Sequence, residues 1–284
     1  MKTDNQLGAA QVPGTPVVEI WDGRNRLGVA DVTGSSWTFT TSEPLSPGTY
    51  ALTAASGAEF SRAWNITVAE QQLDLKHPSV LRAVSGPNNT ATLNYYPANE
   101  NAQVIVPDYN MKTDDTVMVH WEGRNDFKFN TQIQTVGSPP TLKPFVISKY
   151  EVIDVIGDRA TIWYTVKRPP GNVTQTSEKL TLSVVGNEFP IEAPTINGGA
   201  NNLRVKRQVQ FNAETTAKVR GIGLTEWTVE SQPFGAAEHL NFPIDPQWLA
   251  QNRGRDVLFN WSLRLTPSVG NAYRFSQLLR YRLP

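Results

Sequence analysis

Cysteine is missing from all 284 residues of this sequence. The chain therefore has no disulfide framework, no thiol nucleophile and no zinc site built on thiolates. Cytosolic proteins of this size usually carry a few free cysteines, whereas bacterial secreted and surface proteins avoid stray thiols in oxidising surroundings. The absence favours an exported protein, located outside the cell or on a bacterial cell surface.

Long apolar runs and an excess of charge are missing as well. No stretch approaches the roughly 18 apolar residues of a membrane-spanning helix, so no membrane span is predicted. The opening "MKTDNQLGAAQVPG" lacks the apolar core of a signal peptide, which indicates a fragment of a longer exported chain. Lys plus Arg and Asp plus Glu number 26 each, so no overall field attracts nucleic acid or acidic lipid.

Strand patterns dominate what is present. Runs such as "TPVVEIWDG", "RATIWYTVKR" and "RDVLFNWSLRL" are rich in Val, Ile, Thr, Trp and Tyr, and most alternate apolar with polar residues. Turn residues separate them, and the chain has 20 Gly and 20 Pro. No convincing helix appears. This pattern predicts an all-β protein made of antiparallel sandwiches.

One layout of turns and strands occurs twice, in residues 145–168 and 242–265. Each copy opens with a helical turn, capped by Ser148 with Glu151 three residues later, or by Asp245. An alternating strand follows in each. The inward positions are predicted to be Ala160, Ile162, Tyr164 and Val166 in one strand, and Val257, Phe259, Trp261 and Leu263 in the other. Each copy is predicted to be the back half of a β-sandwich.

Two joints divide the chain. The first lies near "VAEQQLDLKHP", and the second reads "NEFPIEAPTI", where alternating Pro and apolar residues predict an extended linker. We therefore expect three domains, residues 1–69, 70–186 and 187–284, which we call segments 1, 2 and 3.

Segment 1 carries a recognisable series of motifs. Asp22-Gly23, Leu27-Gly28, Trp37 with Phe39, and Gly48-Thr49-Tyr50 follow one another in that order. In this order they resemble the bacterial Ig-like repeats of large surface adhesins and other secreted multidomain proteins. Segment 1 departs from the repeats because the usual first strand, ahead of "QLGAAQVPG", is expected to be missing, which would leave its sandwich incomplete.

The other two segments resemble the family less closely. Segment 2 is similar to a related bacterial Ig-like type through "VIVPDYNMKTDDTVMVHWEG" and "SEKLTLSV". Segment 3 shares only "APTI" and the repeated layout, and "GIGLTEWTVESQPFGAAEHLNF" departs from it. The resemblance implies tandem immunoglobulin-like β-sandwich domains in an extended arrangement. It also implies a spacer or adhesive role beside neighbouring domains, with no catalytic residues.

Aromatic residues of segment 3 form the candidate ligand-binding surface. Trp227, Phe234 and His239 lie in the divergent stretch, and Trp248 lies in the helical turn. An exposed aromatic ring can stack on the C–H face of a sugar. For Trp248, however, packing beneath its turn is the favoured interpretation, and a structural role is also favoured for the divergent stretch.

Two functions therefore stay open. The chain is a non-catalytic structural or adhesive module, or it is a targeting module whose segment 3 binds a host or surface glycan or a protein receptor and delivers an attached toxin or enzyme. Exposed rings would favour targeting, and buried rings would remove its support.

Metal and catalytic sites are not predicted, and neither is a cofactor. His120 and Glu122 share a strand face but have no third ligand in sequence. Asp114-Asp115 lies in a turn, where a calcium ion is an alternative to backbone capping. An enzyme would need convergent ionisable groups. The scattered carboxylates that could supply them are Glu226, Glu230 and Glu238.

Overall fold

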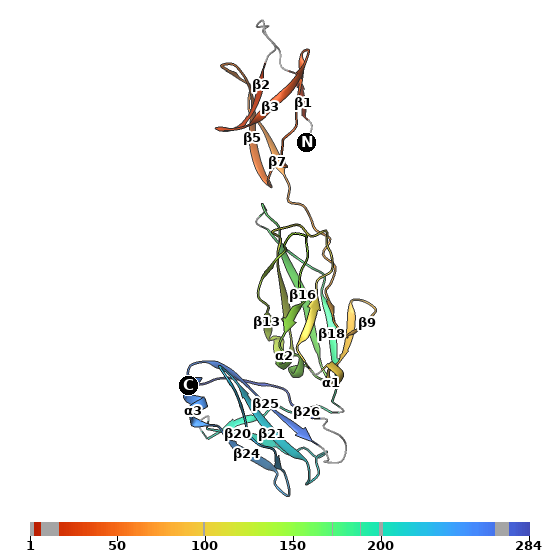
Figure 1. Cartoon of the computed structure of the whole chain (residues 1–284), viewed down its shortest axis with the longest axis vertical. Coiled ribbons are helices and arrows are strands. Elements are labelled where there is room, and N and C mark those ends of the chain that lie inside the picture. The colour runs from red at the N-terminus through yellow and green to blue at the C-terminus, as the bar shows by residue number, and fades with distance from the viewer. Residues whose placement is uncertain are drawn as a thin grey trace. The chain divides into compact units, whose positions relative to one another are not determined.

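The structure is a computed structural model that describes residues 3–6, 17–98, 100–171, 173–187, 189–198, 201–264 and 273–284. Its described residues are almost entirely strands and turns, which confirms the predicted all-β, immunoglobulin-like class. The chain forms two compact units (Figure 1). The N-terminal unit comprises residues 1–73 and 167–175, and the C-terminal unit comprises residues 74–166 and 176–284.

Segment 1 forms one sheet in the order β1-β4-β3-β2-β5-β6, with β7 also paired to β5. Its strands are β1 (Thr3–Gln6), β2 (Val18–Asp22), β3 (Asn25–Thr33), β4 (Ser36–Phe39), β5 (Gly48–Ser56), β6 (Glu59–Phe60) and β7 (Trp64–Val68). Ile20, Trp37 and Phe39 lie in its core. A strand therefore does precede "QLGAAQVPG", since β1 pairs antiparallel with β4.

Segment 2 folds as two sheets. The larger has the order β13-β12-β16-β18-β10-β9, with β14 on β12 and β17 on β16, and the smaller is β15-β11-β8. Its elements are β8 (Ser79–Val80), β9 (Val84–Gly86), β10 (Thr90–Asn94), α1 (Tyr95–Ala98), β11 (Ala102–Ile105), β12 (Thr116–Glu122), η1 (Arg124–Asp126), β13 (Lys128–Asn130), β14 (Gln134–Thr135), β15 (Phe145–Ile147), α2 (Lys149–Asp154), β16 (Arg159–Lys167), β17 (Thr174–Thr176) and β18 (Leu180–Val185).

Segment 3 also folds as two sheets. One is β19-β20-β24, and the other is β22-β21-β25-β26, with β23 on β21 and β27 on β25. Its elements are β19 (Thr195–Asn197), β20 (Asn202–Lys206), β21 (Thr216–Ile222), β22 (Glu226–Thr228), β23 (Gln232–Pro233), β24 (His239–Pro243), α3 (Pro246–Gln251), β25 (Asp256–Arg264), β26 (Arg274–Phe275) and β27 (Leu279–Arg282). Apolar side chains from both sheets share one core.

The repeated layout is confirmed. Ser148 caps α2 by accepting a hydrogen bond from the backbone N–H of Tyr150, and Asp245 caps α3 by accepting one from Gln247. The strands that follow, β16 and β25, bury the apolar positions expected of them. One detail differs from a capping box, because the carboxylate of Glu151 binds Arg280.

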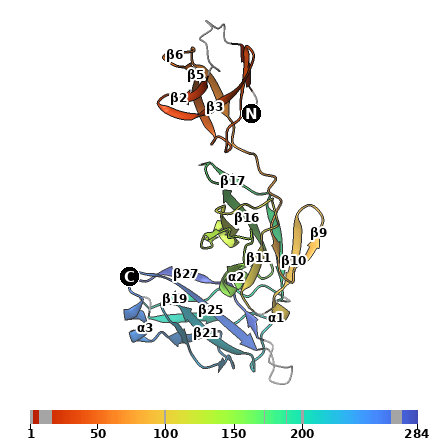
Figure 2. The same cartoon turned by 45° about the horizontal axis from the view of Figure 1, so that its top comes forward.

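Strand β25 departs from simple alternation. Asn260 and Ser262 occupy outward positions, yet they are 0% and 1% exposed. A polar residue on the outer face of a sandwich is normally solvated, so another part of the molecule must cover this face. The end of segment 2 lies against this sheet: α2 is beside β25 and β27 in Figure 2, and Tyr95 of α1 contacts Phe275 of β26, which is paired with Ser262. We call this contact, which lies within the C-terminal unit, the junction.

Candidate functional site

Trp248 is a core residue and does not form a ligand-binding platform. Its side chain is 4% exposed, and its indole N–H donates to the backbone oxygen of Thr225 at 2.9 Å. Its ring lies 5.6 Å from that of Phe259 and 6.1 Å from that of Trp227. Gly221 makes this packing possible, because a Cβ there would lie 3.0 Å from the Trp248 ring.

The other candidate residues do not complete an exposed surface. Phe234 is 2% exposed and packs against Phe211 and Trp261. Trp227 is half-buried against the segment 3 core, and half-buried His239 lies opposite Lys206 in the sheet. Phe234 and Trp248 are therefore buried in the core, whereas Trp227 and His239 keep part of their surface exposed.

The ionisable groups that do converge lie at the junction, around Asp154 of α2. The Asp154 side chain is 2% exposed and accepts from Arg124 Nη2 at 2.9 Å and Arg280 Nη2 at 3.0 Å. It also accepts from the backbone N–H of Leu278 at 2.8 Å. One carboxylate of segment 2 thus binds both a side chain and the main chain of segment 3.

Glu151, one helical turn earlier, reinforces this contact. Its carboxylate oxygens accept from Arg280 Nη2 at 2.7 Å and Nη1 at 3.3 Å, a bidentate pairing. The Arg280 guanidinium carbon lies 3.4 Å from the centroid of the Phe127 ring. Arg124 also donates to the carbonyl of Leu278 at 2.9 Å. Two carboxylates and two guanidinium groups neutralise one another, as buried charges require.

Tyrosines hold the opposite side of the junction. The Tyr150 hydroxyl donates to Glu226 at 2.6 Å, and burial, helped by this hydrogen bond, raises the pKa of Tyr150 above its usual range. Tyr96 hydrogen-bonds Asn187, whose amide donates to the carbonyl of Phe275 at 2.9 Å. The Tyr95 ring meets that of Phe275 edge-on, with 5.7 Å between centroids.

Alkaline pH is expected to open the junction. Burial raises the pKa of Tyr95 and of Tyr96 from 10.0 to about 12. A pKa raised by folding gives stability that is complete below about pH 10 and is lost between about pH 10 and 12. The measurement is phenolate absorbance and hydrogen exchange of residues 274–284 against pH, in the wild type and in the Tyr95→Phe/Tyr96→Phe double variant. If the double variant and the wild type have the same phenolate absorbance up to pH 12, then Tyr95 and Tyr96 do not ionise in this range, and the expectation is contradicted.

The residues considered for catalysis or metal binding do not form a second site among the described residues. Of the three carboxylates that an enzyme could have used, Glu226 accepts a hydrogen bond from Tyr150, and Glu230 and Glu238 are exposed. Over the described ranges, no group of three or more His, Asp or Glu side chains could hold a metal ion. Asp115 is fully buried and accepts from the backbone N–H of Lys112 at 3.0 Å, which is the backbone-capping role. His120 stacks on Trp163 at 5.2 Å.

Sequence reasoning missed the residues of the junction. It assigned Glu151 to a helix cap and gave Asp154, Arg124 and Arg280 no role. One signal was available: two acidic residues three apart lie on one side of the otherwise apolar turn "YEVIDVI". Their partners in segment 3, Arg280 and Leu278, lie more than 120 positions away, and Arg124 lies 30 positions before Asp154, so no local pattern identifies them.

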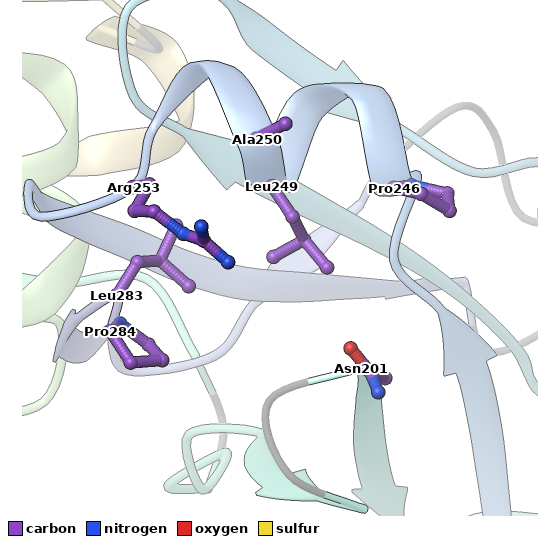
Figure 3. A pocket seen from close by; sticks show the side chains of 7 residues that line it. All are labelled: Asn201, Pro246, Leu249, Ala250, Arg253, Leu283 and Pro284. Carbon is purple, nitrogen blue, oxygen red and sulfur yellow. The ribbon is translucent and has the colours of Figure 1, made fainter.

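Segment 3 does not repeat this arrangement on its own helical turn. Counted from the N-caps, Trp248 and Gln251 of α3 replace Glu151 and Asp154. The surface there holds a cavity of about 260 Å³ (Figure 3). Its lining residues are Asn201, Pro246, Leu249, Ala250, Arg253, Leu283 and Pro284. This lining has one cationic side chain and no Asp or Glu side chain to bind arginines as α2 does.

No helix in the described part of the chain is long and apolar enough to cross a membrane.

No family model matches the sequence, and no curated protein matches it. Three solved structures are similar at low identity. A tetra-tandem repeat from the extending region of a large adhesion protein is 14% identical, over 95% of this chain and 68% of that one, with a TM-score of 0.31. A 1.5-MDa bacterial ice-binding adhesin is 12% identical, over 97% and 88%, with a TM-score of 0.29. A two-domain fibronectin type III segment of chicken tenascin is 11% identical, over 73% and 97%, with a TM-score of 0.23. TM-scores this low support no functional assignment.

Proposed function

We propose that this chain is a non-catalytic structural or adhesive module of a protein that is extracellular or on a bacterial cell surface. It consists of three immunoglobulin-like domains, residues 1–69, 70–186 and 187–284, and its partners are neighbouring domains of a longer chain. Nucleic acid and membrane insertion have no part in this role.

The junction is the observation that carries the proposal. The side chains of Glu151 and Asp154 are 7% and 2% exposed, and both bind Arg280 of the next sandwich. A catalytic carboxylate must reach a substrate proton, whereas these two are fully used in joining domains. The best-positioned ionisable groups of the chain therefore serve mechanical continuity between segments 2 and 3.

A pulling experiment on the full chain tests the structural role. Arg280 joins both carboxylates, so Arg280→Gln is expected to lower the force at which segments 2 and 3 separate. Arg282→Gln is the matched control, since Arg282 binds only Asp256 and both side chains are more than 60% exposed. Equal rupture forces in the wild type and in Arg280→Gln would count against a load-bearing junction.

Binding of the full chain to cells and to a glycan panel tests the adhesive role. The variant to compare is Trp227→Ala, because Trp227 is the least buried of the three candidate aromatic rings. Saturable binding that Trp227→Ala abolishes, with folding intact, would favour the targeting alternative. Binding by the wild type that Trp227→Ala retains would favour an adhesive surface elsewhere, and no binding leaves the structural role.

A further inference from the structure

A cavity of about 290 Å³ lies at the junction. Tyr95 and Lys149 line it from segment 2, and Arg220, Glu226 and Phe275 line it from segment 3. Pockets for drug-sized ligands have volumes from about 300 Å³ upwards. This cavity lies at the lower end of that range, so its volume suits a molecule no larger than a single sugar. The cavity is separate from the Asp154 network, none of whose side chains lines it.

The charges around the cavity favour an anion. One carboxylate oxygen of Glu226 accepts a hydrogen bond from the Tyr150 hydroxyl. The other oxygen lies 3.8 Å from Arg220 Nε, which is too long for a hydrogen bond. The Lys149 ammonium lies over the Tyr150 ring, 5.1 Å from its centroid. Two cations therefore surround one carboxylate that is already engaged. The forked donors of a guanidinium match the two oxygens of a carboxylate.

Polar groups in and beside the cavity have hydrogen-bonding capacity to spare. Tyr95 is 1% exposed, and its hydroxyl has no hydrogen-bond partner among the described residues. Asn260 lies directly opposite Arg220 in the sheet, and Ser262 lies opposite Phe275. Their side-chain polar atoms also have no partner in the described part of the chain. Of these residues Tyr95 lines the cavity, and its buried hydroxyl calls for a ligand group that both donates and accepts, as a hydroxyl does.

We propose that this cavity binds a small hydroxylated carboxylate of the size and class of a hexuronate. Arg220 and Lys149 hold the carboxylate, and the hydroxyls meet Glu226 and Tyr95. The Phe275 ring closes the apolar side of the cavity, where it already contacts the rings of Tyr95 and Tyr96 and the Arg220 guanidinium. The ligand would touch both sandwiches and thereby stabilise the junction.

Calorimetric titration of the full chain tests the proposal with sodium glucuronate, glucose and benzoate. Glucuronate is expected to bind saturably, and both other probes more weakly, since glucose lacks the carboxylate and benzoate lacks the hydroxyls. Arg220→Gln is expected to weaken glucuronate binding about tenfold or more, as loss of a hydrogen bond to a charged group does. Arg282→Gln, an exposed arginine outside the cavity, is expected to leave binding unchanged.

A second variant, Lys149→Gln, keeps the test decisive if Arg220→Gln fails to fold, because the half-buried Lys149 has only a ring contact to lose. Absence of glucuronate binding at millimolar concentration would overturn the proposal. Equal binding of glucose or benzoate would do the same, and so would binding that neither cavity variant weakens. These outcomes leave the pulling experiment unaffected, so this site and the structural role can fail independently.

Discussion

Replacing Asp154 with alanine is expected to destabilise the junction by about 3–5 kcal/mol, the usual loss when one partner of a buried ion pair is removed. Arg124 and Arg280 would each lose a carboxylate, and the Leu278 N–H would lose its acceptor. The measurement is hydrogen exchange of residues 150–156 and 274–284 in the full chain. Their opening free energy should fall by this amount, which is at least about a hundredfold in exchange rate.

Asp256→Ala is the matched control for this experiment. It breaks an Asp–Arg pair of the same chemistry and nearly the same length, 3.0 Å, but the Asp256 side chain is 79% exposed. Exposed pairs contribute about 0–1 kcal/mol, so exchange at the junction should barely change. If Asp154→Ala behaves like Asp256→Ala, segments 2 and 3 do not depend on the buried network.

Trp248→Ala is expected to lower the free energy of unfolding of segment 3 by about 3–5 kcal/mol. The change empties a space between Phe259 and Trp227 and leaves the Thr225 carbonyl without its indole donor. Urea unfolding of the full chain, followed by hydrogen exchange across residues 201–264, measures the loss. In a binding assay, this variant would report unfolding and not the removal of a contact with a ligand.

Trp163→Ala provides the comparison. It removes the same side chain from an outward position, where Trp163 is half-buried and contacts His120 and Lys179. Ring stacking and cation–π contacts of this kind are worth about 1–2 kcal/mol together, so the loss should be clearly smaller. A Trp248→Ala variant as stable as the wild type would instead mean that the ring is not part of the core.

The two substitutions are expected to differ in which backbone amides they expose. A β-sandwich can keep its fold while its neighbour detaches, so Asp154→Ala should leave the core amides of β21 and β25 protected. Trp248→Ala should expose them. Comparing exchange in these two strands therefore separates loss of the junction from loss of the sandwich itself.

Local patterns by themselves determined the architecture within each sandwich. Alternation set the inward faces of β16 and β25, and Ser148 and Asp245 marked the starts of two helical turns, since strand period and helix capping depend only on near neighbours in sequence. The sequence patterns did not predict strand β1, because "TDNQ" has no apolar alternation and only its pairing with β4 defines it.

Tertiary structure alone decided which surfaces meet. From the sequence, Asn260 and Ser262 are outward residues of a strand and should be solvated, yet in the structure they are buried. The sequence also does not decide whether Trp248 is exposed or buried, because that depends on the space that Gly221 leaves for its ring. Asp154 and Leu278 are 124 positions apart, and no periodicity in one sequence spans that separation. Packing between domains depends on the shape and charge of whole surfaces, whereas strand and helix patterns describe only the residues within one element.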